Sequence, residues 1–129
     1  EIGHLILKDS SSELLKMADR IAYTHHEKFD GSGYPRGLHG HDIDIEGRII
    51  AVADVYDALI EERIYKPAYS EAKTLTLMQE RVGIHFDPEV YEAFKKAYSE
   101  IAEARTSINN RIHSESKNIR KNGFRTCRL

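Results

Sequence analysis

Hydrophobic residues recur at the three- and four-residue spacing of α-helices through most of the chain, and no stretch sustains the two-residue alternation of a β-strand. The spacing predicts four helices, over residues 11–28, 45–60, 70–81 and 87–101. Helices without strands can bury their apolar faces only against one another. The predicted fold class is therefore all-α, a helical bundle.

Helix start signals precede each of the four predicted helices. Ser10 and Glu13 have the spacing of a capping box, and Asp44 and Ser70 are N-cap residues. Asp87 is followed by a proline at the first helical position, where the missing N–H costs nothing.

Glycine and proline are concentrated between the first two predicted helices. Residues 29–44 hold four glycines and one proline, interleaved with Phe29, Tyr34 and Leu38. Apolar side chains at these positions indicate an ordered loop rather than a flexible linker.

The composition is typical of one soluble domain: 129 residues, 40% of them hydrophobic and 31% charged. No apolar run reaches the roughly 20 residues of a membrane-spanning helix, and the N-terminus lacks a secretory signal pattern. Cys127 is the sole cysteine, which excludes an internal disulfide framework. A reducing, cytoplasmic location is expected.

Charge divides the chain near residue 104. Residues 1–104 carry a net charge of −8 and residues 105–129 carry +6. Apolar residues thin out in the second part, so residues 105–129 are expected to be a basic C-terminal tail, either a frayed helix or disordered. A basic tail can contact nucleic acid or an acidic membrane. This one has a single aromatic residue, Phe124, so we expect it to be solvated, with no specific nucleic-acid partner.

Two adjacent histidines, His25 and His26, end the first predicted helix. Neighbouring helical residues point about 100° apart, so these imidazoles suit two neighbouring metal ions better than one. Asp54, on the apolar second helix, is the expected carboxylate ligand, because an unpaired carboxylate would be costly to bury there. Glu27 is expected to orient an imidazole rather than to bind metal directly.

The histidine pair also fits a solvated helix end, where the helix dipole favours positive charge. The adjoining residues 30–35, DGSGYP, favour the metal-site hypothesis. A structural turn explains the glycines and the proline. It does not explain Tyr34, which indicates a rigid lip on a site.

Four sequence blocks, HHEKFDGSGYPRGLHG, RIIAVADVYDAL, ERIYKPAYS and GIHFDPEV, occur in the order and spacing of the HD-GYP family of bacterial phosphodiesterases. The chain resembles this family over residues 1 to about 101. The resemblance implies an all-helical fold of the HD metal-phosphohydrolase class. It also implies hydrolysis of cyclic di-GMP with two or three divalent metal ions, iron or manganese.

Matched position by position, the resemblance places metal ligands at His25, His26 and Asp54. It places cations that contact the substrate phosphate at Arg63 and Lys66, a role that suits guanidinium and ammonium groups. Considered without the family, Arg63 and Lys66 lie three residues apart and also fit solvated surface cations.

Gly33, Tyr34 and Pro35 match the family's signature loop. The resemblance places this loop at the rim of the active site and links it to contacts with diguanylate cyclase domains. The implied reaction is in-line attack of a metal-bridging hydroxide on phosphorus, with no protein nucleophile.

The chain departs from the family in lacking its upstream His-Asp pair. The single His-Asp dipeptide, His41-Asp42, follows the signature loop, and His4 is displaced along the helix from a family ligand position. Residues 1–104 are therefore expected to be a partial HD-GYP domain, without the HD-bearing N-terminal helices, with an incomplete metal site and no activity alone. The alternative is a non-catalytic regulatory or protein-interaction module. Uncovered apolar helix faces should also favour self-association.

Overall fold

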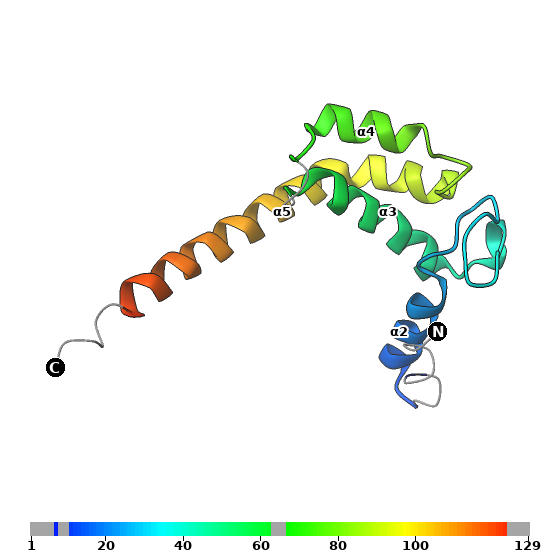
Figure 1. Ribbon diagram of the computed structural model, residues 1–129, viewed down its shortest axis with the longest axis horizontal. Helices are drawn as coiled ribbons and strands as arrows, with labels where there is room; N and C mark the ends of the chain where they lie inside the picture. The colour runs from blue at the N-terminus through cyan, green and yellow to red at the C-terminus, as the bar shows by residue number, and fades with distance from the viewer. Residues whose placement is uncertain (1–6, 8–10, 63–66, 124–129) are drawn as a thin grey trace. The chain divides into compact units, whose positions relative to one another are not determined.

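The structure is a computed structural model that describes residue 7, residues 11–62 and residues 67–123. Within these residues it contains four α-helices, one 3-10 turn and two isolated β-bridges, but no strand. The all-α prediction is confirmed. The elements, in chain order, are α2 (Glu13–Thr24), η1 (Gly40–Asp42), α3 (Ile45–Ile60), α4 (Glu71–Gln79) and α5 (Pro88–Gly123) (Figure 1).

Three of the four predicted helix starts are confirmed, at α3, α4 and α5. Ser70 Oγ accepts a hydrogen bond from the Lys73 N–H at 3.4 Å, and Asp87 Oδ1 accepts one from the Glu89 N–H at 2.8 Å. Asp44 holds the N-cap position of α3, but its side chain makes no capping bond. Helix α2 begins two residues later than predicted, with Ser12 at its N-cap and no side-chain capping bond, while the predicted cap residue Ser10 lies outside the described residues.

Helix α2 ends at Thr24, earlier than predicted, because the following loop folds back onto residues 27 and 28. Helix α5 is longer than predicted and continues to Gly123, where the sequence suggested a frayed or disordered tail. No proline interrupts residues 89–123, so helical geometry continues without an apolar core to support it.

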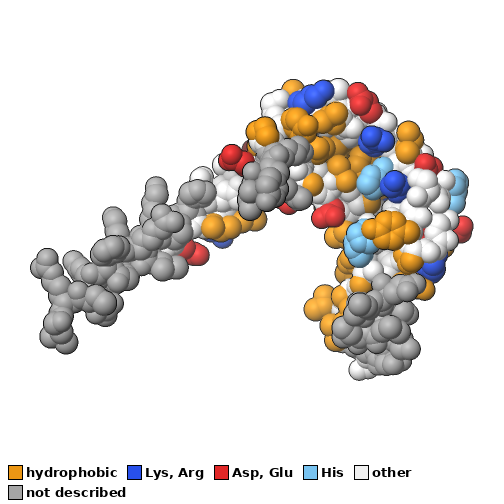
Figure 2. All heavy atoms as spheres, in the orientation of Figure 1, with side chains coloured by type: hydrophobic (Ala, Val, Ile, Leu, Met, Phe, Trp, Pro, Cys, Tyr) orange, Lys and Arg blue, Asp and Glu red, His pale blue; other side chains and the backbone are white. Residues whose placement is uncertain are grey.

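The chain divides into two compact units, residues 1–94 and residues 95–129. The core of the first unit surrounds α3. On the face seen in Figure 2, exposed hydrophobic side chains gather over the region of α3 and α4. The Tyr91 hydroxyl donates to the Leu75 carbonyl oxygen at 3.2 Å, which joins the start of α5 to α4. The buried hydrophobic side chains are Ile43, Ala51, Val52, Tyr56, Ile60, Met78, Phe86 and Tyr91.

Helices α2 and α3 cross in close contact at Gly47. A Cβ atom on Gly47 would lie 2.8 Å from Thr24 Cβ and closer still to the Thr24 hydroxyl, so only glycine fits. An ion pair between Arg20 Nη2 and Glu46 Oε1, 2.6 Å apart, joins the same helices. This crossing holds the residues directly after Thr24 beside α3.

Part of the apolar surface stays uncovered. On α2, Leu14 is 73% exposed, and Leu15 and Met17 are also exposed. Among the described helices, none combines the length and hydropathy that crossing a lipid bilayer requires.

Candidate functional site

His25 and His26 follow α2 directly, and their rings lie against each other with centroids 3.9 Å apart. The Nδ1 atom of His25 lies 2.9 Å from the carbonyl oxygen of Ile21, an acceptor, so Nδ1 carries the proton and donates. In the neutral ring the lone pair is therefore on Nε2, which is free to bind a metal ion. The end of α2 thus fixes both the orientation and the tautomer of His25.

Tyr34 covers His26. The two rings stack with centroids 4.7 Å apart and an interplanar angle of 25°, and the Tyr34 N–H donates to the His26 carbonyl oxygen at 3.2 Å. Tyr34 itself is 61% exposed. The signature loop therefore touches the histidine pair, as a lip on the site would.

Gly33 lets the loop approach this closely. A Cβ atom there would lie 2.5 Å from Glu27 Cα and closer still to the backbone nitrogen of Lys28. Backbone atoms cannot rotate away as a side chain can, so no larger residue fits at position 33. The glycine of the signature is required by packing.

Glu27 has a different role from the one predicted. Its side chain is 2% exposed, and its two oxygens accept hydrogen bonds from the Arg36 N–H at 2.9 Å and the Leu38 N–H at 3.0 Å. The carbonyl of Ile21, rather than Glu27, orients the His25 ring. The sequence could not reveal this role, because the partners of Glu27 are backbone groups nine and eleven residues away.

The far side of the loop is held by the turn between α4 and α5. The Asp30 N–H donates to the Ile84 carbonyl oxygen at 2.9 Å, and the Phe29 N–H donates to the His85 carbonyl oxygen at 3.3 Å. An isolated bridge pairs Asp30 with His39 across the loop. The GIHF segment is therefore a support for the signature loop.

A buried ion pair fixes that turn to α3. Arg48 Nη1 lies 2.5 Å from Asp87 Oδ2, and Asp87 is 1% exposed. Burial alone would raise the pKa of Asp87, but hydrogen bonds from Arg48 and from the N–H groups of Glu89 and Val90 outweigh it and lower the pKa. Asp87 is thus both the N-cap of α5 and an ionised anchor. The sequence indicated only the cap.

The electrostatics of His26 favour a neutral ring. Loss of water around the ring lowers the pKa of His26, the adjacent His25 lowers it further, and the negative charge of Asp54 only partly opposes them. A neutral imidazole is the form that binds metal ions. Asp54 itself is exposed on α3, so burial does not force it to find a partner, as the sequence argument assumed. The negative charge of Asp54 nevertheless acts on His26 and raises its pKa, so Asp54 is electrostatically coupled to the histidine pair.

The side chains of His25, His26 and Asp54 are of the chemical type that binds transition metals, because imidazole nitrogen and carboxylate oxygen are both common ligands. They fall short in number. Within residues 11–62 and 67–123, no three histidine, cysteine, aspartate or glutamate side chains meet closely enough to hold an ion. Among the described residues, His25, His26 and Asp54 therefore do not by themselves form a complete metal site. Arg63 and Lys66, the predicted phosphate contacts, lie outside the described residues.

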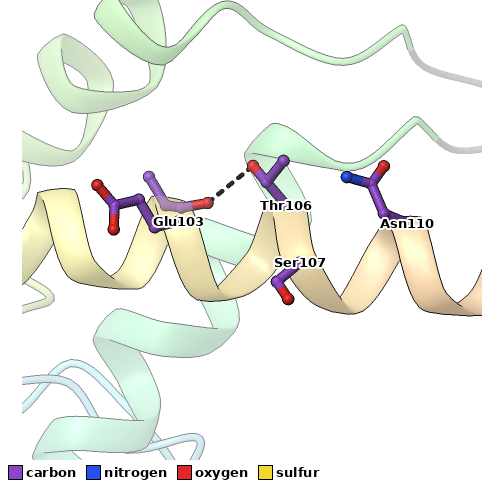
Figure 3. Close-up of a pocket in the computed structure, with 5 residues that line it drawn as sticks. Glu103, Thr106, Ser107 and Asn110 are labelled. Carbon is purple, nitrogen blue, oxygen red and sulfur yellow. Dashed lines mark hydrogen bonds between the residues drawn. The ribbon is translucent and has the colours of Figure 1, made fainter.

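A shallow depression on α5 is a second surface feature (Figure 3). All the residues that line it come from one helix, and the Thr106 hydroxyl donates to the Ala102 carbonyl oxygen at 2.9 Å. Glu103 is the only ionisable residue in its lining, so it offers no catalytic or metal-binding set. The lining residues are Ala102, Glu103, Thr106, Ser107 and Asn110.

Comparison with known proteins places the chain among helical HD domains. The family model described as "HD domain" matches residues 6–90. The chain belongs to this family, and within it to the HD-GYP type, as the four sequence blocks predicted. Enzymes of this kind are metal-dependent.

Several curated relatives are similar over the same region. A cyclic di-GMP phosphodiesterase of Vibrio cholerae is 55% identical over 84 residues, which cover 65% of this chain and 17% of the relative. One of Thermotoga maritima is 44% identical over 102 residues, covering 79% and 28%. A 3'3'-cGAMP-specific phosphodiesterase of V. cholerae is 43% identical over 108 residues, covering 84% and 21%. The chain thus spans 17–28% of the length of these relatives.

A solved structure supports the fold. The crystal structure of a cyclic GMP-AMP-specific phosphodiesterase from V. cholerae superimposes with a TM-score of 0.60 at 22% identity, covering 76% of this chain and 21% of that one. At this identity the likeness extends to the fold alone.

Proposed function

We propose that this chain is part of a metal-dependent phosphodiesterase that hydrolyses cyclic di-GMP. The observation that carries the proposal is the pair of adjacent histidine rings, whose centroids lie 3.9 Å apart: Nε2 of His25 is available to a metal ion, and His26 stacks on Tyr34 in surroundings that lower its pKa. Two curated relatives, at 55% and 44% identity, are named cyclic di-GMP phosphodiesterases.

In this proposal His25, His26 and Asp54 hold divalent metal, with iron or manganese suited to the imidazole and carboxylate donors. The metal would act as a Lewis acid toward the phosphodiester and lower the pKa of a water. The chain's own residues prepare the site. The Ile21 carbonyl presents Nε2 of His25, and the lowered pKa of His26 favours the neutral ring, which is the form that binds metal. Arg63 and Lys66 are proposed to contact the substrate phosphates.

The test is hydrolysis by the full-length gene product, loaded with Mn²⁺ or Fe²⁺. Cyclic di-GMP and 3'3'-cGAMP are supplied separately, and linear dinucleotides are measured by chromatography. We expect cyclic di-GMP to be cleaved, His26→Ala and Asp54→Asn to abolish cleavage, and Asp57→Asn, an exposed carboxylate one turn along α3, to retain it. We expect the present chain alone to be inactive, because its described residues give an incomplete ligand set.

The outcomes separate the competing functions. Preferential cleavage of 3'3'-cGAMP would give this protein the substrate specificity for which two other relatives are named, in place of cyclic di-GMP. Binding of either dinucleotide without cleavage would indicate the non-catalytic regulatory module. Equal activity of Asp54→Asn and Asp57→Asn would refute the ligand assignment.

The proposal includes partners and location. We propose a cytoplasmic protein whose exposed Tyr34 and neighbouring loop offer a contact for diguanylate cyclase domains, because exposed aromatic residues are enriched at protein interfaces. The uncovered Leu14, Leu15 and Met17 favour self-association of the chain. Light scattering during size-exclusion chromatography tests this, and a monomer at high concentration would contradict it.

A further inference from the structure

We propose that Glu27 is the positioning residue of this site: its buried carboxylate fixes the signature loop so that Tyr34 lies on His26. The inference about geometry stands on contacts within the chain. Only its consequence for catalysis rests on the proposed function.

The Glu27 carboxylate is a strong anchor for the signature loop. Glu27 is 2% exposed, and each of its carboxylate oxygens accepts one backbone N–H, from Arg36 and from Leu38. Hydrogen bonds to a charged acceptor are shorter and stronger than neutral ones. Without them the carboxylate would be buried without partners, at the full cost of its desolvation. The loop and the carboxylate therefore hold each other in place.

Tyr34 lies in a short stretch of the loop that is hydrogen-bonded at both ends. The Tyr34 N–H is bonded to the His26 carbonyl oxygen at 3.2 Å, and two residues later the Arg36 N–H is bonded to Glu27. Just before Tyr34, Gly33 rests directly on the backbone of residues 27 and 28. Because Tyr34 lies inside this short clamped stretch, movement of residue 36 or 38 is transmitted to its ring.

The position of Tyr34 determines the surroundings of the His26 ring. The Tyr34 ring lies 4.7 Å from that of His26 and keeps water from one of its faces. Glu27 touches neither ring through its hydrogen bonds, yet it decides whether Tyr34 stays on His26. A glutamine at this position would present an NH₂ group to one of the two backbone N–H donors, and two donors cannot bond.

The experiment measures the stack itself by NMR. An aromatic ring shifts the resonances of protons lying over its face, so Tyr34 should move the His26 ring protons upfield. The shift is measured at about pH 8, where histidines are neutral, and Tyr34→Leu defines its value without the ring. We expect Glu27→Gln to lose more than half of the difference between wild type and Tyr34→Leu. The Arg36 and Leu38 amides should exchange with solvent faster in the same variant.

Asp30→Asn is the matched control. Asp30 lies in the same loop and accepts the Ser32 N–H at 2.9 Å, but its carboxylate is exposed. We expect it to keep the His26 shift and the protection of both amides. Wild-type shifts and amide protection in Glu27→Gln would overturn the proposal, as would equal losses in Asp30→Asn.

A second variant covers the case in which Glu27→Gln does not fold. Glu27→Asp keeps the charge and both acceptor oxygens but retracts them by one methylene, so we expect an intermediate His26 shift in a folded protein. An unchanged shift in Glu27→Asp would count against the proposal. Because these measurements need neither metal nor substrate, their failure is distinguishable from failure of the proposed activity.

Discussion

Replacing Gly33 with alanine tests how closely the signature loop rests on the end of α2. The added methyl carbon would lie 2.5 Å from Glu27 Cα and 2.6 Å from Glu27 C, and nearer still to the Lys28 nitrogen. Carbon atoms in contact normally lie about 3.5–4.0 Å apart. The loop must therefore move outward by roughly an ångström.

The size of the expected destabilisation follows from the contacts that this movement breaks. Overpacking of a close contact costs about 1–3 kcal/mol when the surroundings yield. Here the yielding part is the loop, whose attachment includes two hydrogen bonds to the buried Glu27 carboxylate. Bonds to charged groups contribute about 1.5–3 kcal/mol each. We expect Gly33→Ala to destabilise the closed loop by about 3 kcal/mol.

Native-state hydrogen exchange at the Arg36 and Leu38 amides is the assay, because their protection reports the Glu27 bonds directly. A loss of about 3 kcal/mol corresponds to exchange faster by roughly two orders of magnitude. Gly83→Ala is the control. Its φ of +79° makes alanine unfavourable, but no atom lies within 4 Å of the added methyl group. Gly83 belongs to the GIHF segment that holds residues 29 and 30, so this variant should loosen that side of the loop and lower stability, but it should speed exchange at residues 36 and 38 much less than Gly33→Ala does. Wild-type protection of both amides in Gly33→Ala would refute the close approach.

Three further predictions concern the supporting structure. Arg48→Met removes the guanidinium bonded to the buried Asp87 carboxylate and leaves it with the exposed His41 ring 3.9 Å away. It should lower the free energy of unfolding by about 3–5 kcal/mol; a loss below about 1 kcal/mol in urea titrations would contradict this. The pKa of Asp87 is lowered, so its stabilisation is present above pH 3.8 and is lost as pH falls through the lower folded value. The free energy of unfolding of Asp87→Asn should therefore fall less steeply than that of the wild type as the pH drops through this range. The pKa of His26 is lowered too, so its NMR titration midpoint should fall below 6.5, and a midpoint above that value would refute the described environment.

The sequence predicted that Tyr34 lies beside the histidine pair, but not the other contacts of this region. Adjacent histidines followed by a glycine-rich turn with a tyrosine indicated a site with a rigid lip, and Tyr34 does stack on His26. The role of Glu27 could not be predicted, since neighbouring histidines suggested an imidazole partner and the real partners are distant amides. Asp54 was placed on the correct helix, but its exposure depends on how α3 packs.

Helix type and the starts of α3, α4 and α5 were determined by the sequence alone, because periodicity and capping are local properties of neighbouring residues. Tertiary structure decided where α2 ends, since that depends on Gly33 meeting the backbone of residues 27 and 28. It also decided the partners of the charged groups. Arg48 and Asp87 are 39 residues apart in the chain, and only packing of the α4–α5 turn against α3 brings them together. Local patterns determine elements, whereas the burial of charge is settled only when elements meet.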